Sequence, residues 1–372
     1  MLFELKPEQY EQIAPVLAEQ ANHHILCAAV LAGQSEGRVL VDDPAAPQTV
    51  MAIRGDRWCF GGGDLQNEAF WQGLTAELDA PTIFPKLPGA LFFNSMTPAW
   101  QGWLAGLVAG RQIIPMPRRL YQAEAGLTVG DVALPAGYQL HFMDETIRSQ
   151  IAGELPGDVS NVLKLRQGQD RPDEAAFGFA VIQAGECVAQ AMVDYIVGDR
   201  GEIGLFTAPS HRQKRLGEAT AAATIRYGLA HGLRLIDWDC TAFNVGSRRL
   251  AEKLGLRLTA EYTQGWLIFS EVSYLVNWGF YAVDTGRYAE ALAWCEQTLA
   301  VEHELALPYG HYLAGVARAG LGETEAALTQ LQAAATAGFD ELAELTERAE
   351  LKPLHDQAAW PALLTRVGQN LG

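Results

Sequence analysis

The sequence is short of basic residues. It holds 27 Lys and Arg against 44 Asp and Glu, which gives a formal net charge of −17. Binding to nucleic acid or to an anionic membrane needs a surplus of Lys and Arg, so the composition argues against both kinds of partner. An acidic surface suits a cationic or amine-bearing partner, although in most proteins it serves only solubility.

Cysteines and long apolar runs are also scarce. The five cysteines are scattered and form no CxxC pair, so we expect neither a disulfide framework nor a metal site. No apolar run approaches the roughly 18 residues of a membrane span. The first residues show no signal-peptide pattern. We therefore expect a soluble, cytoplasmic protein that does not bind membranes.

The chain has an ordinary globular composition. Its 372 residues are 49% hydrophobic and 19% charged, which argues against disorder and suggests two or three domains. We predict an N-terminal α/β domain over 1–130, a strand-rich central domain over 131–272 and an all-α tail over 273–372.

In the first segment, apolar periodicity and turn residues predict two helices and three strands. Gly61–Gly63 looks like a phosphate loop, but no Walker lysine follows it, so a loose turn is the better interpretation. The turn-rich run Gln122–Gly137 predicts a domain linker. The expected elements are helices at Pro7–Gln20 and His24–Ala32, and strands at Arg38–Asp42, Val50–Arg54 and Trp58–Gly61.

The central segment begins with three predicted antiparallel strands, separated by polar turns. Two helices follow, and Gly232 and Gly255 end them. The predicted elements are strands Phe177–Gln183, Cys187–Val197 and Glu202–Thr207, helix Leu216–His231, strand Leu233–Cys240, helix Asn244–Leu254, and strands Leu256–Thr263 and Trp266–Phe269.

The last segment contains an internal repeat. Thr285–Val301 matches Leu321–Ala337 at an offset of 36 residues, which pairs Gly286 with Gly322. The offset and the pattern of small residues resemble tetratricopeptide repeats. Two units fall short of the three or so usually needed for stability, so we expect this segment to pack on the central domain or on a partner protein.

One loop of the central segment is basic. Three of the four residues in Arg212–Arg215 are basic, and a predicted helix begins at Leu216. A helix N-terminus offers unpaired N–H groups and partial positive charge, which together with basic side chains suit a pyrophosphate. An ordinary solvated loop is the alternative.

This loop and a second motif resemble the GNAT-type N-acetyltransferase superfamily. The family pattern Arg/Gln-x-x-Gly-x-Gly/Ala is matched by the run from Arg212 to Gly217, with Arg215 in place of the middle glycine. The pattern Asn-x-x-Ser, followed by Lys-Leu-Gly, is matched at Asn244, Ser247 and Lys253–Gly255. The resemblance covers about 138–272. It implies the acyl-CoA N-acyltransferase fold, an α/β (α+β) fold in which helices flank a mixed, mostly antiparallel sheet.

The resemblance also implies a reaction. An acetyl group would pass from acetyl-CoA to the primary amine of a small molecule or peptide, by direct attack on the thioester. A backbone N–H near Phe206 or Thr207 would meet the oxyanion. Asn244 is equally suited to capping a helix. The implied cofactor-binding residues are Phe206, Thr207, Arg212, Gln213, Lys214, Arg215, Leu216, Gly217, Glu218, Asn244 and Ser247.

Carboxylates on neighbouring strands are candidates for the general base. Glu202 begins the strand that leads into the basic loop and is the first candidate, and Asp194 on the preceding strand is the second. Asp237 and Asp239 share one face of their strand. They either hold a cationic amine or are solvated acids at a strand end.

Two departures from the family pattern leave an alternative open. Many relatives carry a proton-donating tyrosine where this chain has Ala251, so the thiolate would be protonated by Tyr262 or by water. With Arg215, this departure favours a catalytically degenerate, CoA-binding scaffold whose repeats bind a protein partner. Residues 1–130 could be a second acetyltransferase-like half without a cofactor loop.

Overall fold

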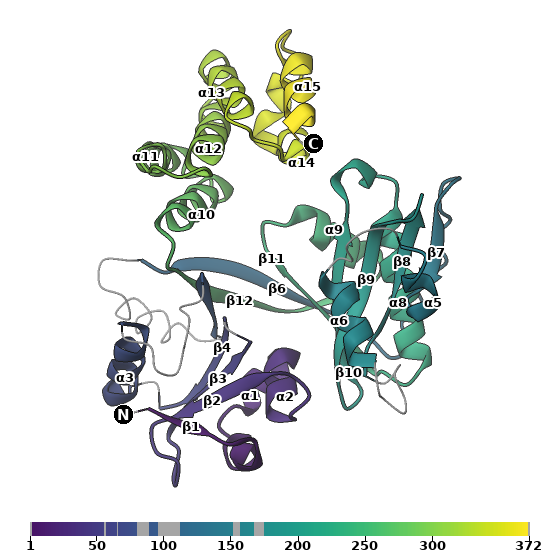
Figure 1. Cartoon of the computed structure of the whole chain (residues 1–372), viewed down its shortest axis with the longest axis vertical. Helices are drawn as coiled ribbons and strands as arrows, with labels where there is room; N and C mark the ends of the chain where they lie inside the picture. Colours follow the sequence, from purple (N-terminus) through teal and green to yellow (C-terminus); the bar gives the residue numbers. More distant parts are fainter. Residues whose placement is uncertain are drawn as a thin grey trace. The chain divides into compact units, whose positions relative to one another are not determined.

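The computed structural model describes residues 2–55, 57–64, 66–79, 89–95, 112–151, 157–166 and 175–370. The chain divides into two compact units (Figure 1). The first holds most residues up to Gly265. The second holds Trp266–Gly372 and short segments around Ala90 and Ile114. The predicted segments 1–130 and 131–272 thus lie mostly in one unit, and the boundary near 130 stays a prediction.

Within the described residues, twelve strands form one sheet in the order β1-β2-β3-β4-β5-β12-β6-β11-β10-β9-β8-β7. The pairs β4–β5 and β10–β11 are parallel, while β1–β2, β2–β3, β3–β4, β6–β11, β7–β8, β8–β9 and β9–β10 are antiparallel. The predicted mixed, mostly antiparallel sheet is confirmed. The strands are Phe3–Leu5, Gly37–Val41, Thr49–Arg54, Trp58–Gly63, Ala90–Ser95, Ile114–Glu124, Gln139–Phe142, Phe177–Gln183, Glu186–Val197, Arg200–Thr207, Leu235–Thr241 and Arg257–Ile268, for β1 to β12.

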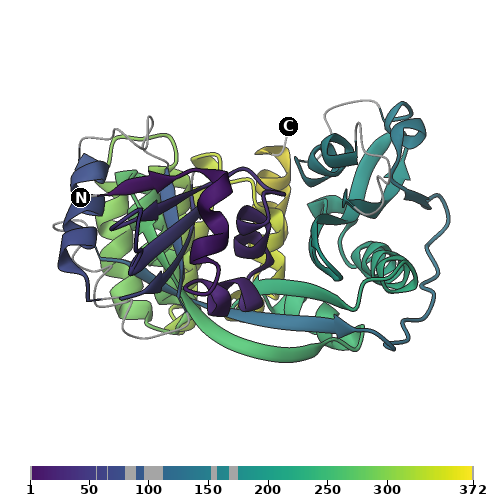
Figure 2. The same ribbon diagram turned by 90° about the horizontal axis from the view of Figure 1, so that it is seen from below.

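Short helices cover one face of the N-terminal strands (Figure 2). They are η1 (Pro7–Ile13), α1 (Ala18–His23) and α2 (Ile25–Leu31), and α3 (Glu68–Asp79) follows β4. Ile13, Leu17 and Val30 pack with Val39, Val50 and Phe60 of β2, β3 and β4 in one apolar core. Burial of this apolar face stabilises the arrangement.

Two predictions for this segment are wrong. Pro7–Gln20 is not one helix, because the chain turns at residues 14–17 between η1 and α1, where Pro15 has no N–H to continue the ladder. Gly61–Gly63 is not a loose turn but the end of β4, paired with β3. Gly63 has φ +88°, and a Cβ there would overlap the Gln48 carbonyl oxygen, so only glycine fits.

The predicted three-strand meander of the central segment is confirmed as β8, β9 and β10. The two predicted helices are α8 (Leu216–Ala230) and α9 (Val245–Lys253). Ala221, Ala222 and Ile225 of α8 lie in the core with Phe177 of β8 and Ala191 of β9. Small side chains let this helix approach the sheet closely. The helices α5 (Glu145–Arg148) and α6 (Gly157–Arg166) precede β8.

Two further boundaries are corrected. The predicted linker Gln122–Gly137 begins inside β6, whose residues up to Glu124 pair with β11. The two strands expected at Leu256–Thr263 and Trp266–Phe269 are one strand, β12, which continues through Gln264 and Gly265. Figures 1 and 2 show β6 and β12 as two long strands side by side.

The second unit is helical. Its helices are α10 (Glu271–Asp284), α11 (Tyr288–Leu299), α12 (Ala306–Gly320), α13 (Thr324–Thr336), α14 (Leu342–Glu347), η3 (Ala349–Leu354) and α15 (Trp360–Asn370). Gly286 and Gly322 take φ of +72° and +79° in the turns of two successive helical hairpins. The equivalent Ala291 and Ala327 are fully buried. A helical tail is confirmed, and its assignment as tetratricopeptide-like repeats stays a prediction.

Candidate functional site

The parallel strands β10 and β11 separate partway along their length. They pair at Arg200–Glu202 with Leu235–Asp237, after which β10 stays paired with β9 as far as Thr207. Over its whole length β11 stays paired with β6. The two strands therefore form a fork that opens after Glu202 and Asp237. The exposed Phe206 lies on the free part of β10.

The loop after β10 has an unusual backbone. Gln213 and Arg215 have φ of +60° and +64°, the left-handed region that favours glycine. Arg215 is also the N-cap residue of α8 and offers no capping hydrogen bond. Arg212, Gln213, Lys214 and Arg215 are all exposed. The loop thus presents uncapped N–H groups at a helix N-terminus, next to three basic side chains.

The arginine that replaces the expected glycine is held by an ion pair. Arg215 Nε and NH2 donate to the Glu218 carboxylate at 3.0 and 2.9 Å. Lys253 Nζ of α9 donates to the same carboxylate at 2.6 Å. The two cations, with Arg215 first, lower the pKa of Glu218 to about 2. Arg215 therefore holds a left-handed backbone conformation, the kind that favours glycine, while its side chain pairs with Glu218 of α8.

Packing fixes the rest of the loop. A Cβ on Gly217 would lie 3.0 Å from Thr207 Oγ1, so the start of α8 closely approaches the end of β10. Leu216 is buried among apolar residues of β8 and β9. Lys214 Nζ donates to the Tyr138 hydroxyl at 3.0 Å and to Ser210 O at 3.1 Å.

The second motif forms the start of α9. Asn244 caps the helix, since its Oδ1 accepts from Ser247 N at 2.9 Å, so its capping role is confirmed. Ser247 Oγ accepts from the indole N–H of Trp238 on β11 at 2.9 Å. Ala251 is fully buried in the core. The side chain at the position of the family tyrosine therefore faces packed apolar groups.

Glu202 lies where the fork opens and is partly buried. Desolvation is the main cause that raises the pKa of Glu202 to about 8, and the negative charges of Asp239 and Asp237 raise it further. The positive charges of Arg118 and Arg200 act in the opposite direction. Among the residues that the structure describes, none is a hydrogen-bond partner of the Glu202 carboxyl. A carboxyl with a pKa near neutrality is suited to accepting a proton at physiological pH.

Asp237 and Asp239 are not solvated acids at a strand end, because both side chains are buried beneath the fork. The Asp237 carboxylate accepts from Arg200 Nε at 2.6 Å and from Gln122 Nε2 at 2.9 Å. Asp239 accepts from Arg118 Nε at 3.0 Å. Burial raises the pKa of both aspartates and each bound arginine opposes the rise.

The other two catalytic candidates sit on either side of this cluster. The Tyr262 hydroxyl of β12 donates to Asp239, and burial raises its pKa, so it holds its proton. Asp194 is the extra residue of a bulge in β9, since Tyr195 faces Glu202 while Val193 faces Ile203. The Asp194 side chain is partly buried. Asp194 precedes Tyr195, the residue that pairs with Glu202 in the sheet.

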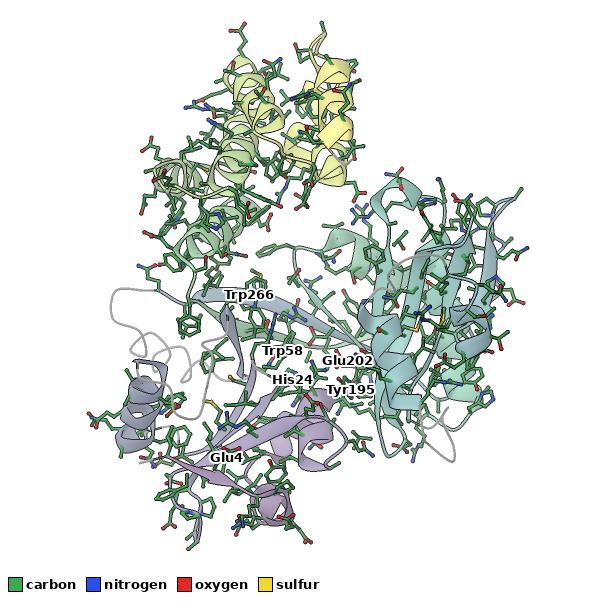
Figure 3. All side chains as sticks on the ribbon, viewed as in Figure 1. Glu4, His24, Trp58, Tyr195, Glu202 and Trp266 are labelled. Atoms are coloured by element: carbon green, nitrogen blue, oxygen red, sulfur yellow. The ribbon has the colours of Figure 1, made fainter. Side chains whose placement is uncertain are left out.

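Residues that the sequence did not single out complete the cluster. Arg118 and Gln122 come from β6, Arg200 from the start of β10 and His24 from the N-cap of α2. The His24 ring packs edge-on against Tyr262 at 4.9 Å. Figure 3 shows His24 and Glu202 in the same part of the first unit. Only sheet pairing and helix packing join these residues, and no motif could have indicated them.

Two other features are absent from the part of the chain that the structure describes. No group of three or more His, Cys, Asp or Glu residues there could hold a metal ion. None of the described helices is both long and apolar enough to cross a membrane.

The region of the chain that matches known proteins spans most of the first unit. The family model of the GNAT acetyltransferases matches residues 15–264. The uncharacterized N-acetyltransferase YdfB of Bacillus subtilis (strain 168) is 31% identical over 227 residues, which are 61% of this chain and 84% of YdfB. The crystal structure of a GCN5-related N-acetyltransferase-like protein from Streptococcus suis 89/1591 is 19% identical. Its TM-score is 0.50, over 70% of this chain and 99% of that one.

The family match is longer than the resemblance seen in the sequence. It begins at residue 15 rather than near 138, so α1, α2 and β2 to β4 belong to the matched region. It ends at residue 264, before the helical tail. More than half of the sequence is matched, and the chain belongs to the GNAT acetyltransferase family.

Proposed function

We propose that this protein transfers an acetyl group from acetyl-CoA to a primary amine. The observation that carries the proposal is the fork between β10 and β11, which has Glu202 at its base. At the end of β10, the same strand leads into a left-handed, basic loop and an uncapped helix. Residues near the start of β10 would thus act on the amine, and the loop after its end would bind phosphate.

The loop fits the pyrophosphate of coenzyme A. The first N–H groups of α8 have no capping side chain, and Arg212 and Lys214 are exposed beside them. Charge-assisted hydrogen bonds from such groups to phosphate oxygens are strong. We assign the pyrophosphate to residues 212–218, and the pantetheine arm to the fork between Phe206 and the start of α9 at Asn244–Ser247. Acetyl-CoA, when bound, supplies an activated acyl group.

Glu202 takes the role of general base. The amine arrives protonated and must lose two protons as the C–N bond forms and the C–S bond breaks. Glu202 accepts the first proton, directly or through a water, and the second goes through solvent to the leaving sulfur. Tyr262 donates to Asp239, so we assign it to positioning Asp239. Asp194 stays the second candidate for the base.

The alternative, a degenerate scaffold, rests on Arg215 and Ala251. Arg215 adopts a left-handed backbone conformation of the kind that glycine favours, which weakens its use as a sign of degeneracy. Ala251 removes a proton donor, and a coenzyme A thiolate can instead take its proton from solvent. A scaffold would bind coenzyme A and a protein partner without releasing thiol in the presence of any amine.

The proposal is tested with the full-length chain. Calorimetry with acetyl-CoA should show binding, and a thiol reagent should detect coenzyme A released in the presence of a panel of primary amines. Glu202→Gln should bind acetyl-CoA like the parent and lose release by roughly 10²–10⁴-fold. No binding at millimolar acetyl-CoA would overturn the proposal, and binding without release from any amine would favour the scaffold.

A further inference from the structure

We propose that the acceptor binds as an ammonium ion between Glu202 and His24, and that it carries no carboxylate on the carbon next to its amine. The inference rests on the proposed function and names the class of acceptor. Alkylamines, arylalkylamines, polyamines and amino sugars fit this description. Free α-amino acids do not.

Carboxyl groups outnumber guanidinium groups at the fork. Three carboxyls, Glu202, Asp237 and Asp239, interact there with two guanidinium groups, Arg118 and Arg200. Arg200 is bound to Asp237 and Arg118 to Asp239, by hydrogen bonds of 2.6 and 3.0 Å. Glu202 has no cation of its own among the described residues. When Glu202 ionises in this poorly solvated site, an ammonium ion would balance its charge.

His24 has a buried, unpaired ring nitrogen, and its ring contacts Tyr262, which donates to Asp239 of the same cluster. His24 is 6% exposed, and its Nε2 is buried without a hydrogen-bond partner in the described structure. Burial lowers the pKa of His24 to about 3, helped by the nearby His23, Arg200 and Arg118. The imidazole is therefore neutral and can accept a hydrogen bond from an ammonium N–H. Since buried polar atoms are seldom left unpaired, Nε2 is suited to a ligand.

Several contacts fix the position of His24. Arg200 donates to three backbone carbonyls at the end of α1, those of Ala21, Asn22 and His23, at 3.1, 2.6 and 3.1 Å. The arginine that neutralises Asp237 thus also fixes the chain just before His24. His24 is further held between the rings of Phe60 and Tyr262, at 5.5 and 4.9 Å. The N-terminal half therefore supplies one side of the acceptor site.

The carboxyls of this cluster disfavour an acceptor that has a carboxylate next to its amine. A carboxylate on the adjacent carbon would lie within a few ångströms of Glu202, Asp237 and Asp239. Both arginines of the cluster already pair with aspartates. At such distances like charges in a partly buried site repel one another. The acceptor site therefore discriminates by charge rather than by size.

The first experiment compares matched acceptors on the full chain: phenethylamine with phenylalanine, and agmatine with arginine. For at least one pair, kcat/KM of the amine should exceed that of the amino acid by about tenfold or more. Equal or better acetylation of the amino acids would overturn the inference while leaving acetyl transfer established. If no acetyl-CoA binds, the proposed function fails. In that case, calorimetry measures the binding of each amine and each amino acid to the chain without acetyl-CoA. Equal binding of the two members of a pair, or no binding of either, would overturn the inference.

The second experiment tests His24 with the best acceptor found. His24→Phe keeps a ring for packing and should raise the KM of the amine by about tenfold, with the KM of acetyl-CoA unchanged. His24→Gln retains a hydrogen-bonding group, so its KM for the amine should lie between those of the parent and of His24→Phe. If His24→Phe folds poorly, His24→Gln still tests the role of His24. His231→Phe, an exposed histidine at the end of α8, is the matched control. An unchanged amine KM in both His24 variants would overturn the role of His24.

Discussion

At the scale of single residues, the candidate site holds a carboxyl, that of Glu202, which ionises only at mildly alkaline pH. Glu202 has a pKa raised to about 8, first by desolvation and then by Asp239 and Asp237, against Arg118 and Arg200. A base works in its deprotonated form. We therefore expect kcat/KM to rise with pH and to level off above about 8.

The variant Glu202→Gln should lack this rise. Initial rates at saturating acetyl-CoA between pH 6 and 9.5 would measure it, with Glu186→Gln as a control on an exposed carboxyl at the start of β9. The same pH profile in the parent and in Glu202→Gln would show that another group, such as Asp194, is the base.

Glu202 should also make stability depend on pH. Its pKa is about 8 in the folded chain and 4.5 in the reference state, so between these values the folded state holds more protons than the unfolded state. The free energy of unfolding must then fall as pH rises through this window. Glu202→Gln removes that loss. The free energy of unfolding of the variant should exceed that of the parent only slightly at pH 5. The difference should grow up to about pH 8 and then stay constant.

Urea denaturation of both proteins at pH 5, 7 and 9 measures the difference. Asp237 and Asp239 are present in both, so their own titration cancels in the comparison. Parallel curves for parent and variant would mean that Glu202 is solvated rather than desolvated at the fork.

The backbone and the side chain of Arg215 have opposite effects on stability. Its φ of +64° is strained for any residue but glycine, while its guanidinium is tied to Glu218. Arg215→Ala and Arg215→Gly both lose the ion pair, and only glycine relieves the backbone. We expect the glycine variant to unfold about 2–4 °C higher than the alanine variant. Equal midpoints in a thermal melt would show that the loop relaxes.

At the scale of elements, the start of α8 concentrates positive charge in an acidic protein. We expect Arg212→Glu with Lys214→Glu to weaken coenzyme A binding by at least about tenfold and to flatten its dependence on salt, because charge-assisted contacts to the pyrophosphate are lost. Calorimetry at 50 and 300 mM NaCl would measure both effects. Arg287→Glu with Arg318→Glu, on helices of the second unit, changes the net charge equally and should leave binding intact.

Elements were predictable where a local signal marked both ends. The meander β8 to β10 is bounded by polar turns, and Gly232 and Gly255 follow α8 and α9 closely. Prediction failed where an apolar pattern ran across an interruption, as at Pro15, or where pairing lengthened a strand. Gln264 and Gly265 resemble a turn in sequence, and β12 nevertheless continues through them. The strand β6 is stabilised by pairing with β11, more than a hundred residues later.

At the scale of the whole molecule, every proposed site residue lies in the first unit, and the repeat-bearing helices form the second. A ligand that binds one folded unit stabilises that unit by mass action. Calorimetric unfolding should therefore show two transitions, and coenzyme A should raise the midpoint of only one. A truncation is not needed, since the full chain reports on both units. A single transition that shifts as a whole would show that the units unfold together.

The sequence by itself determined what is local. The acidic composition, the basic loop at 212–215, the helix-capping Asn244 and the spacing of two motifs were sufficient to predict the GNAT resemblance and the strand that carries Glu202. The 36-residue repeat likewise predicted a helical tail. Each of these features is carried by residues close together in the chain, so periodicity and spacing reveal it.

Tertiary structure decided the environment of the site. It joined Arg118 and Gln122 of β6, Asp239 of β11, Tyr262 of β12 and His24 of α2 around one fork. It also buried two aspartates that could equally have been solvated. Charge balance and desolvation depend on distances between strands and helices that are far apart in sequence. For this reason, the family could be inferred from motifs, while the pKa of Glu202 and the unpaired nitrogen of His24 could be found only in the folded chain.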